Sequence, residues 1–285
     1  MVKYFKSLTL IAAFFLTVCP AHAKNDGSLQ VKGSDTMVNL VQGWAEEFMK
    51  KNPDAFIAVT GGGSGTGLAA LINGTCDVAM SSREIKKQEI ELAEKKNVHP
   101  KEFRVALDGL AVVANPQNPV SKLTIDELAA IFTGRITNWH EVGGEDARIV
   151  VLSREVNSGT HVYFKEHILR KGDASSKEEF TSSALLLSSS QAIADEIKQN
   201  KSAIGYYGMG YISPDHKALS VAKAGGEYVA PTVENIIRSK YPISRPLIIY
   251  TNGEPQDGTK QFLDFILSPE GQTIVTKMDF VPIKQ

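Results

Sequence analysis

Apolar residues recur at helical spacing near the start of the chain, directly after a short run typical of a β-strand. Residues 29–32 form that run, and the following stretch carries one apolar stripe at i, i+3, i+4, i+7 and i+11: Met37, Leu40, Val41, Trp44 and Phe48. Such a stripe predicts an amphipathic α-helix. Ser34 or Asp35 provides an N-cap, and Asn52-Pro53 ends the helix.

Short strands and helices alternate along the rest of the chain, with brief loops between them. Asp108-Gly109 interrupts two predicted strands, and Pro246 marks another as an edge strand. This alternation predicts an α/β fold, in which ligands bind at the carboxyl ends of strands. We expect strands at 55–60, 77–80, 103–107, 110–114, 148–152, 203–207 and 245–250, and helices at 68–72, 86–96, 125–132, 160–170, 188–200, 259–267 and 269–278.

The first 23 residues have the layout of a secretory signal peptide. Lys3 and Lys6 precede an apolar run over residues 8–18, and Ala21-His22-Ala23 provides a small-x-small exit. The apolar run is too short to span a bilayer, which takes about 20 residues. We therefore expect cleavage after Ala23 and a protein located in the periplasm.

Composition and charge narrow the class of ligand. The 285-residue chain is 42% hydrophobic and 22% charged, as in ordinary soluble globular proteins. Its 31 Lys and Arg against 32 Asp and Glu give a net charge of −1, which falls to −3 once the predicted signal peptide is removed. This balance excludes the broad basic footprint of nucleic-acid-binding proteins and leaves room for a site for one small anion. Two cysteines, Cys19 and Cys76, are too few for a disulfide framework.

Four short segments rich in hydrogen-bond donors follow predicted strands, and at least three of them open a helix. Helix N-termini carry unpaired N–H groups that bind oxyanions, hydroxyls add neutral donors, and Arg adds a charged, two-pronged donor. Each segment alone is typical of an ordinary helix cap, but the set of four predicts one site around a tetrahedral anion. The segments are Gly33-Ser34-Asp35-Thr36, the glycine-rich run 61–67, Ser81-Ser82-Arg83, and Arg154 with Ser158-Gly159-Thr160. The run 61–67 lacks the spacing of a P-loop or a dinucleotide-binding loop.

Together with three further motifs, these segments make the sequence resemble the periplasmic phosphate-binding proteins of ATP-driven phosphate importers. The further motifs are Leu-Thr-Ile-Asp-Glu-Leu at 123–128, Ile-Phe-Thr-Gly at 131–134 and Ile-Thr-Asn-Trp at 136–139, and the resemblance spans essentially the whole chain after residue 23. It implies a two-domain periplasmic-binding-protein clamshell with mixed sheets flanked by helices and two hinge crossings. It also implies that the clamshell closes on inorganic phosphate and delivers it to the permease subunits of an ABC importer in the inner membrane.

The division into domains is expected near a composition break. Residues 115–119 read Asn-Pro-Gln-Asn-Pro, which favours a crossing between domains at this point. We expect a first domain formed by residues 24–114 and 245–285, and a second domain, inserted into the first, formed by residues 115–244.

The resemblance also assigns ligand-binding residues. In the first loop it points to Thr36 and the backbone amide of Met37, with Ser34 beside them, and in the second loop to Ser64. Arg154 corresponds to the charged donor of the family. Carried over position by position, the predicted donors are Ser34, Thr36, Met37, Ser64, Arg154, Ser158, Gly159 and Thr160.

Ser82 departs from the family pattern, because many members have an Asp there that accepts the proton of HPO₄²⁻. A carboxylate that faces sulfate, which carries no proton, meets only acceptors, so such an Asp separates the two anions. This chain has Ser82-Arg83 instead, and we include both in the predicted site. We prefer Asp108 over Asp35 as the proton acceptor, although Asp108 as a structural partner of Arg83 is an equally open interpretation.

Other functions stay open at this point. A receptor for another tetrahedral oxyanion, such as sulfate or molybdate, has the same features, as does a phosphate sensor without a transporter. An exported phosphoester hydrolase would use Ser158 or Thr160 near His161, but the chain has no G-x-S-x-G motif and no H-E-x-x-H metal-binding motif. We therefore expect a monomeric binding protein with no catalytic residue, metal or cofactor.

Overall fold

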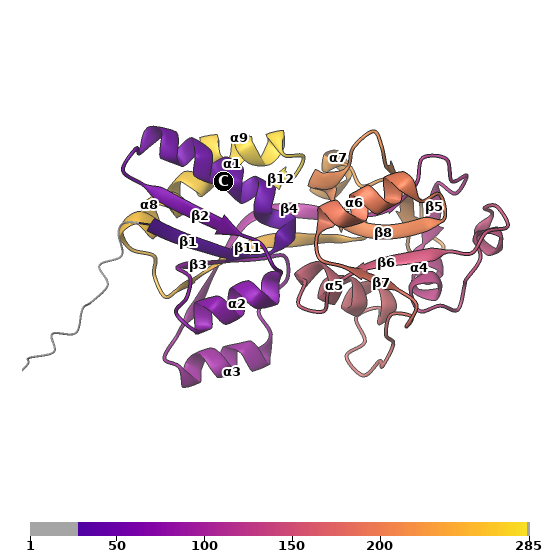
Figure 1. Ribbon diagram of the computed structural model, residues 1–285, viewed down its shortest axis with the longest axis horizontal. Coiled ribbons are helices and arrows are strands. Elements are labelled where there is room, and N and C mark those ends of the chain that lie inside the picture. Colours follow the sequence, from indigo (N-terminus) through magenta and orange to yellow (C-terminus); the bar gives the residue numbers. More distant parts are fainter. Residues whose placement is uncertain (1–27, 284–285) are drawn as a thin grey trace, which may run out of the picture.

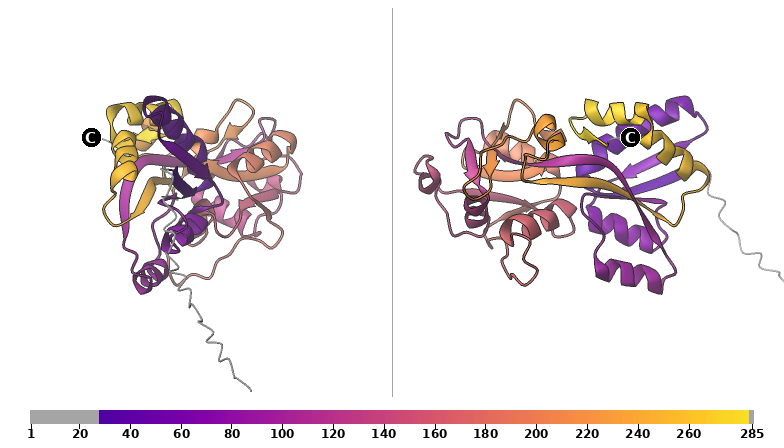
Figure 2. Two further views of the ribbon diagram at one scale, coloured as in Figure 1. Left: turned by 60° about the vertical axis from the view of Figure 1, so that its left-hand side comes forward. Right: turned by 180° about the vertical axis from the view of Figure 1, so that it is seen from behind.

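Two long strands, β4 (Pro100–Ala114) and β11 (Ser244–Asn252), run side by side through the centre of the molecule and connect its two lobes (Figures 1 and 2). The computed structural model describes residues 28–283, so the predicted signal peptide lies outside the described residues. The lobe that contains both ends of the described chain is called the first lobe here, and the other is called the second lobe.

The first lobe is a sheet with helices on both faces. In Figure 1, α1, α8 and α9 cover one face and α2 and α3 cover the other. The apolar stripe predicted on α1 is confirmed, because Leu40, Val41, Trp44 and Phe48 are all buried there. The elements are β1 (Ser28–Gly33), η1 (Asp35–Met37), α1 (Val38–Lys51), β2 (Phe56–Thr60), α2 (Ser64–Ile72), β3 (Val78–Ser81), α3 (Lys87–Lys95), α8 (Asp257–Leu267), α9 (Pro269–Lys277) and β12 (Val281–Pro282).

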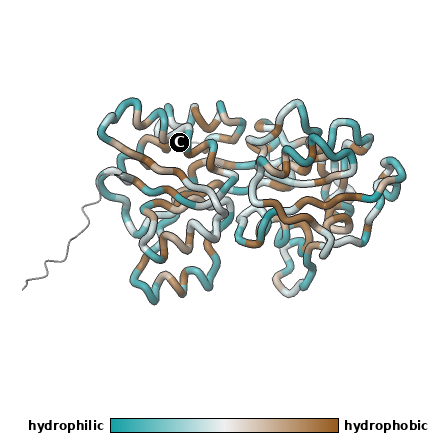
Figure 3. The backbone as a smooth tube through the Cα atoms, viewed as in Figure 1, coloured by the Kyte–Doolittle hydropathy of each residue, from teal (hydrophilic) through white to brown (hydrophobic). Residues whose placement is uncertain are grey.

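The second lobe is built around the other part of the same sheet. Its core holds an aromatic cluster in which the rings of Phe164 and Tyr206 stack with centroids 4.0 Å apart. The strands of this lobe form the most hydrophobic band of its backbone (Figure 3). The elements are β5 (Lys122–Thr124), α4 (Ile125–Phe132), η2 (Trp139–Val142), β6 (Val150–Arg154), α5 (Gly159–Phe164), η3 (Lys165–Leu169), β7 (Leu185–Leu187), α6 (Ser190–Gln199), β8 (Ala203–Gly208), η4 (Met209–Tyr211), β9 (Lys217–Ala218), β10 (Ser220–Ala222) and α7 (Val233–Ile237).

One mixed sheet runs through both lobes in the order β2-β1-β3-β11-β4-β8-β6-β7. The strands β1, β2 and β3 are parallel to one another, as are β6, β7 and β8. The two connecting strands are antiparallel to their neighbours. This mixed sheet, with helices on its faces, confirms the predicted α/β fold class.

The predicted break at Asp108-Gly109 is wrong, since β4 is one continuous strand. The strand changes partners at this point: Asp108 and Gly109 pair with β11, and the residues from Leu110 onward pair with β8. A buried acid is tolerated in mid-strand because Arg245 of β11 lies directly opposite it. Gly109 permits a close approach, because a Cβ atom there would lie 2.4 Å from Cδ1 of Ile236.

The prediction that Pro246 lies on an edge strand is also wrong, since β11 lies between β3 and β4. Residue pairs in an antiparallel ladder alternate between hydrogen-bonded and non-hydrogen-bonded types. The N–H of Leu110 donates to the carbonyl of Ile243, which makes the pair of Leu107 with Pro246 a non-hydrogen-bonded one. In addition, β3 pairs only with the part of β11 from Ile248 onward. Pro246 therefore lacks an N–H at a position where none is needed.

Candidate anion-binding site between the lobes

Three loops of the first lobe bring serine hydroxyls to one edge of its sheet. Since β1 and β3 are parallel, the residues that follow them emerge at the same edge, where α2 also begins. Oγ of Ser34 donates to Oγ of Ser82 at 3.0 Å, and the backbone N–H of Ser82 donates to Oγ of Ser64 at 3.0 Å. All three side chains are buried, so their polar atoms depend on one another for hydrogen bonds.

The start of α5 in the second lobe packs directly against these hydroxyls. The Oγ1 atoms of Thr36 and Thr160 lie 2.9 Å apart and share a hydrogen bond across the two lobes. Gly159 fits only because it has no side chain: a Cβ atom there would lie 2.2 Å from Oγ of Ser64 and 2.8 Å from Oγ of Ser82. We call the five side chains Ser34, Thr36, Ser64, Ser82 and Thr160 the hydroxyl cluster.

Two other predicted donors already have partners within their own elements. Oγ of Ser158 accepts a 3.4 Å bond from the N–H of His161 and so caps α5. The N–H of Met37 donates to the carbonyl of Ser34 at 3.0 Å, which closes η1. The expectation of a Met37 amide that points at the ligand therefore differs from the arrangement seen in the structure.

A buried ion pair adjoins the hydroxyl cluster, and sequence reasoning recognised only one of its two members. Nε and Nη2 of Arg245 donate to the same carboxylate oxygen of Asp108 at 3.0 and 2.9 Å. The other oxygen of Asp108 accepts the N–H of Met209 at 3.0 Å. Both side chains are fully buried, and burial raises the pKa of Asp108 against the opposing attraction of Arg245.

Arg245 also reaches the threonines that join the lobes. Its Nη2 atom donates to Oγ1 of Thr160 at 3.0 Å and lies 3.4 Å from Oγ1 of Thr36. Its Nη1 atom is buried and has no hydrogen-bond partner among the described residues. Asp108 is therefore paired with Arg245 and not with Arg83, and its role as acceptor of the ligand proton stays a prediction. The one available signal for Arg245 was an ionisable residue at the start of a strand that the sequence predicted to lie at an edge.

Arg154, the predicted charged donor, is bound elsewhere. Nε donates to the carbonyl of Leu187 at 3.3 Å and Nη2 to the carbonyl of Ser188 at 3.0 Å. Nη1 donates to Oγ of Ser190 at 3.0 Å and pairs with Asp35 of the first lobe at 3.1 Å. Burial lowers the pKa of Arg154, which Asp35 partly offsets. The arginine thus joins the lobes, because Asp35 belongs to η1 and Arg154 to β6.

Arg83 likewise lies outside the hydroxyl cluster. Its Nη1 and Nη2 atoms form two bonds, of 2.8 and 2.7 Å, to the carboxylate of Glu89. Glu89 is fixed in place because it also accepts the backbone N–H of Lys86 in a capping box at the start of α3. Although burial acts to raise it, the pKa of Glu89 lies below its ordinary value because of the hydrogen bonds from Arg83 and Lys86.

Asn157 provides a further contact between the lobes that sequence reasoning missed. Its Nδ2 atom donates to the carbonyl of Gly62 at 2.8 Å and to Oγ1 of Thr66 at 3.1 Å. Its carbonyl accepts the N–H of Gly65 at 3.0 Å. The glycine-rich run of the first lobe is thereby attached to the loop before α5.

The geometry gives no nucleophile for hydrolysis at Ser158. The imidazole of His161 lies with Nδ1 3.2 Å from Oγ of Ser153, which in turn bonds the hydroxyl of Tyr206 at 2.7 Å. Burial lowers the pKa of His161 to about 4. A hydroxyl nucleophile needs a base within hydrogen-bond reach, and this imidazole faces Ser153 rather than Ser158 or Thr160.

A two-lobed α/β molecule whose lobes meet at an array of buried hydrogen-bond donors has the architecture of a periplasmic binding protein. Sequence comparison agrees. A family model described as a PBP superfamily domain matches residues 19–270. The chain is 36% identical over 265 residues to the phosphate-binding protein PstS of Bacillus subtilis strain 168, covering 91% of this chain and 82% of that protein. It is 33% identical over 275 residues to PstS of Pseudomonas aeruginosa PAO1, covering 90% and 83%.

Solved structures show the same likeness. A structure from Clostridium perfringens, described as a phosphate ABC transporter substrate-binding protein with bound phosphate, matches with a TM-score of 0.81 at 35% identity and covers 90% of this chain and 100% of that one. An ABC-type phosphate transport receptor from Vibrio cholerae matches with a TM-score of 0.71 at 29% identity, with coverage of 90% and 100%. The chain therefore belongs to the PBP superfamily, as a PstS-like member.

Proposed function

We propose that this protein captures inorganic phosphate between its lobes and delivers it to an ABC-type importer. The observation that carries the proposal is the hydroxyl cluster: five buried hydroxyls from both lobes, next to a buried guanidinium with one unpartnered N–H group. A phosphate oxygen accepts strong, charge-assisted hydrogen bonds from such donors. The names of the relatives and the phosphate bound in the Clostridium perfringens structure support the same ligand.

The arrangement favours Arg245 over Arg154 as the charged donor. Arg154 uses its donors on carbonyls of the second lobe, on Ser190 and on Asp35, whereas Nη1 of Arg245 is unpartnered beside Thr36 and Thr160. The hydroxyl cluster and the backbone N–H groups of Gly159 and Thr160 supply the remaining donors, while the N–H of Ser158 donates to the carbonyl of Glu155 at 2.9 Å. An anion would replace the bond between Thr36 and Thr160 that now joins the lobes.

A broader tetrahedral-oxyanion receptor is the second candidate, and one observation favours it. Neither Asp108 nor Asp35 has a hydrogen bond to any serine of the cluster, and both carboxylates are occupied by an arginine and a backbone N–H. Without a carboxylate hydrogen-bonded to the hydroxyl cluster, the discrimination against sulfate falls to hydroxyl groups, which are able to donate as well as accept.

The wider setting is part of the proposal. Residues 1–23 act as a cleaved signal peptide, and the remaining chain acts as a monomeric periplasmic receptor without catalytic residues. Domains 24–114 plus 245–285 and 115–244 open and close about β4 and β11, a division supported by the change of partners within β4. Among the described residues, no helix is long and apolar enough to cross a membrane.

Calorimetric titration with phosphate and with sulfate tests the proposal. We expect phosphate to bind at one tight site. Thr36→Val and Thr160→Val should each lower the affinity for phosphate by about tenfold to a hundredfold, because a hydrogen bond to a charged group contributes about 1.5–3 kcal/mol. Thr273→Val, an exposed threonine on α9, serves as the matched control. Unchanged affinity in both site variants would overturn the site assignment, and equal affinity for sulfate would favour the second candidate.

A further inference from the structure

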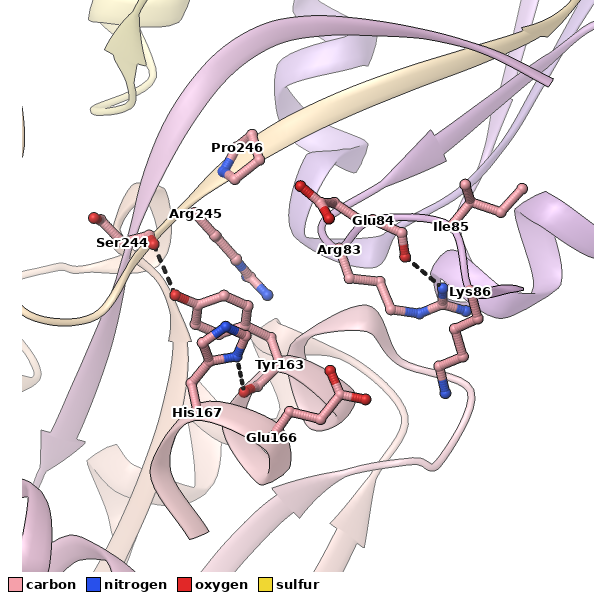
Figure 4. A pocket seen from close by; sticks show the side chains of 10 residues that line it. All are labelled: Arg83, Glu84, Ile85, Lys86, Tyr163, Glu166, His167, Ser244, Arg245 and Pro246. Carbon is pink, nitrogen blue, oxygen red and sulfur yellow. Dashed lines mark hydrogen bonds between the residues drawn. The ribbon is translucent and has the colours of Figure 1, made fainter. Parts of the chain in front are cut away.

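A cavity of about 400 Å³ lies between the lobes, beside β11, and is separate from the hydroxyl cluster. Its walls come from the loop after β3, from α5 with η3, and from the start of β11 (Figure 4). None of the five cluster side chains lines it, and it shares only Arg245 with their hydrogen-bond network. The lining residues are Arg83, Glu84, Ile85, Lys86, Tyr163, Glu166, His167, Ser244, Arg245 and Pro246.

The buried part of this cavity carries two arginines with unpartnered N–H groups. Arg83 is 7% exposed and Arg245 is 2% exposed. Nε of Arg83 and Nη1 of Arg245 have no hydrogen-bond partner among the described residues. A buried donor without an acceptor is unfavourable, so Nε of Arg83, which the hydroxyl cluster does not use, calls for an acceptor in this cavity.

The acids that pair with these arginines do not fill that role. Glu89 and Asp108 bind the other nitrogen atoms of the guanidinium groups, and neither acid lines the cavity. Tyr163 is occupied as well: its hydroxyl donates to the carbonyl of Ser244 at 2.7 Å, and its ring lies 5.6 Å from the guanidinium carbon of Arg245. Burial raises the pKa of Tyr163, which keeps the phenol protonated in this role.

The exposed rim carries charges of both signs. Lys86 extends along the rim on the side of the first lobe, and Glu166 faces it from the second lobe (Figure 4). Glu84 and His167 are exposed on the same rim, and the His167 ring stacks on Tyr163 with centroids 3.9 Å apart. Donors are therefore concentrated in the buried part, while the acids lie toward solvent.

We propose that this cavity binds a second small oxyanion, held by Nε of Arg83 and the ammonium group of Lys86. Because its walls come from both lobes and from a connecting strand, the occupied cavity favours the closed arrangement of the lobes. By linkage, the second anion then raises the affinity of the hydroxyl cluster for its own ligand. The site goes beyond the proposed function and does not depend on the identity of the ligand in the cluster.

Equilibrium dialysis with radiolabelled inorganic phosphate, carried to millimolar free concentration, tests this site. The wild type is expected to bind two phosphates per chain, the second more weakly. Lys86→Met should weaken only the second event, by about tenfold, the effect of losing one charge-assisted bond. Arg83→Lys, which keeps the charge near Glu89 but removes Nε, should weaken the second event as well.

Lys87→Met is the matched control, since Lys87 is the neighbouring exposed lysine and does not line the cavity. It should leave both events unchanged. Saturation of the wild type at one phosphate, or an equal loss of the second event in Lys86→Met and Lys87→Met, would overturn the proposal. The result would differ if the hydroxyl cluster did not bind phosphate. The binding event that Thr36→Val weakens would then be missing, while the binding event that Lys86→Met weakens would persist.

Discussion

The regions around Arg154 and Arg245 both place a buried arginine beside a carboxylate between the lobes, yet they differ in what the guanidinium has left to offer. Nε, Nη1 and Nη2 of Arg154 all have partners, two of them backbone carbonyls. In Arg245, Nε and Nη2 both donate to Asp108, and Nη2 also donates to a threonine of the cluster. Its Nη1 atom has no hydrogen-bond partner among the described residues. Burial and charge alone therefore do not distinguish the two arginines; the donors without a partner among the described residues do, and on that ground we propose Arg245 as the ligand-binding arginine.

The two ion pairs also differ in what they connect. Asp35 and Arg154 belong to different lobes, so this pair must break when the lobes separate. Asp108 and Arg245 face each other across paired strands, so this pair persists. The first region stabilises closure, and the second provides a fixed cationic group at the hinge.

The largest effect is expected from Arg245→Met. The change leaves Asp108 buried without its partner, which costs about 3–5 kcal/mol of unfolding free energy, and it removes the charged donor, so phosphate binding should become undetectable by calorimetry. Urea unfolding measures the first effect. Arg104→Met, which removes an exposed ion-paired arginine, is the control and should cost less than about 1 kcal/mol. Wild-type phosphate affinity in a folded Arg245→Met protein would contradict the account.

His161, in the region of Arg154, is expected to make the free energy of unfolding depend on pH by about 3 kcal/mol. Its pKa of about 4 in the folded protein lies below the ordinary value of 6.5, so the unfolded chain takes up a proton that the folded chain refuses. The resulting stability is fully present above pH 6.5 and is lost as the pH falls toward 4. Relative to wild type, His161→Gln should lack this component in urea unfolding at several pH values. The control His99→Gln, at an exposed histidine, should keep the pH-dependent component of stability. Identical pH profiles for wild type and His161→Gln would refute this interpretation.

Asp35→Asn should have an intermediate effect, because it weakens the pair that joins the lobes without touching the hydroxyl cluster. We expect phosphate affinity to fall by about tenfold, the equivalent of about 1.4 kcal/mol less stabilisation of the closed state. Calorimetry measures the affinity, and small-angle scattering measures the shift toward an open form. Asp126→Asn, which disrupts an exposed ion pair with Lys171, is the control. A loss as large as that of Arg245→Met would erase the distinction between the two regions.

The smallest effect is expected from Asn157→Ala, at an interlobe contact without charge. Its side chain makes two bonds, to the carbonyl of Gly62 and to Thr66. Their loss should lower phosphate affinity by about twofold to fivefold, since neutral hydrogen bonds contribute about 0.5–1.5 kcal/mol in net terms. Asn73→Ala, at an exposed asparagine of the first lobe, controls for the substitution. An increase in affinity would contradict a role in closure.

Local pattern was enough to predict most of the longer helices and strands and the convergence of the donor loops of the first lobe. Parallel strands deliver the residues that follow them to one edge, so Ser34, Thr36, Ser64 and Ser82 were recognisable from their positions after strands or at the start of a helix. Arg245 was not, because its role depends on the register of β11 against β4, which joins residues 137 positions apart. Register is a tertiary property that no local pattern encodes.

Three further sequence-based expectations concern Arg83, Arg154 and β4, and the partners of their charged side chains bear on each. Arg83 was expected at the anion, but Glu89, fixed by the capping box of α3, takes two of its nitrogens. Arg154 was expected there too, but the carbonyls that bind it belong to the last residue of β7 and to the residue after it, which are distant in sequence. The interruption expected in β4 is absent because Arg245 compensates Asp108 from the neighbouring strand. For Arg154 and Asp108 a partner distant in sequence decides the direction of the charged side chain, whereas for Arg83 the partner is six residues further along the chain, in the next helix.

The most direct measurement is a crystal structure of the protein with phosphate. The account predicts an oxygen of the anion at hydrogen-bond distance, about 3 Å, from Nη1 of Arg245, other oxygens on hydroxyls of Thr36, Ser64 and Thr160, and Arg154 still bound to Asp35. Phosphate held by Arg154, with Arg245 turned away from it, would contradict the central claim.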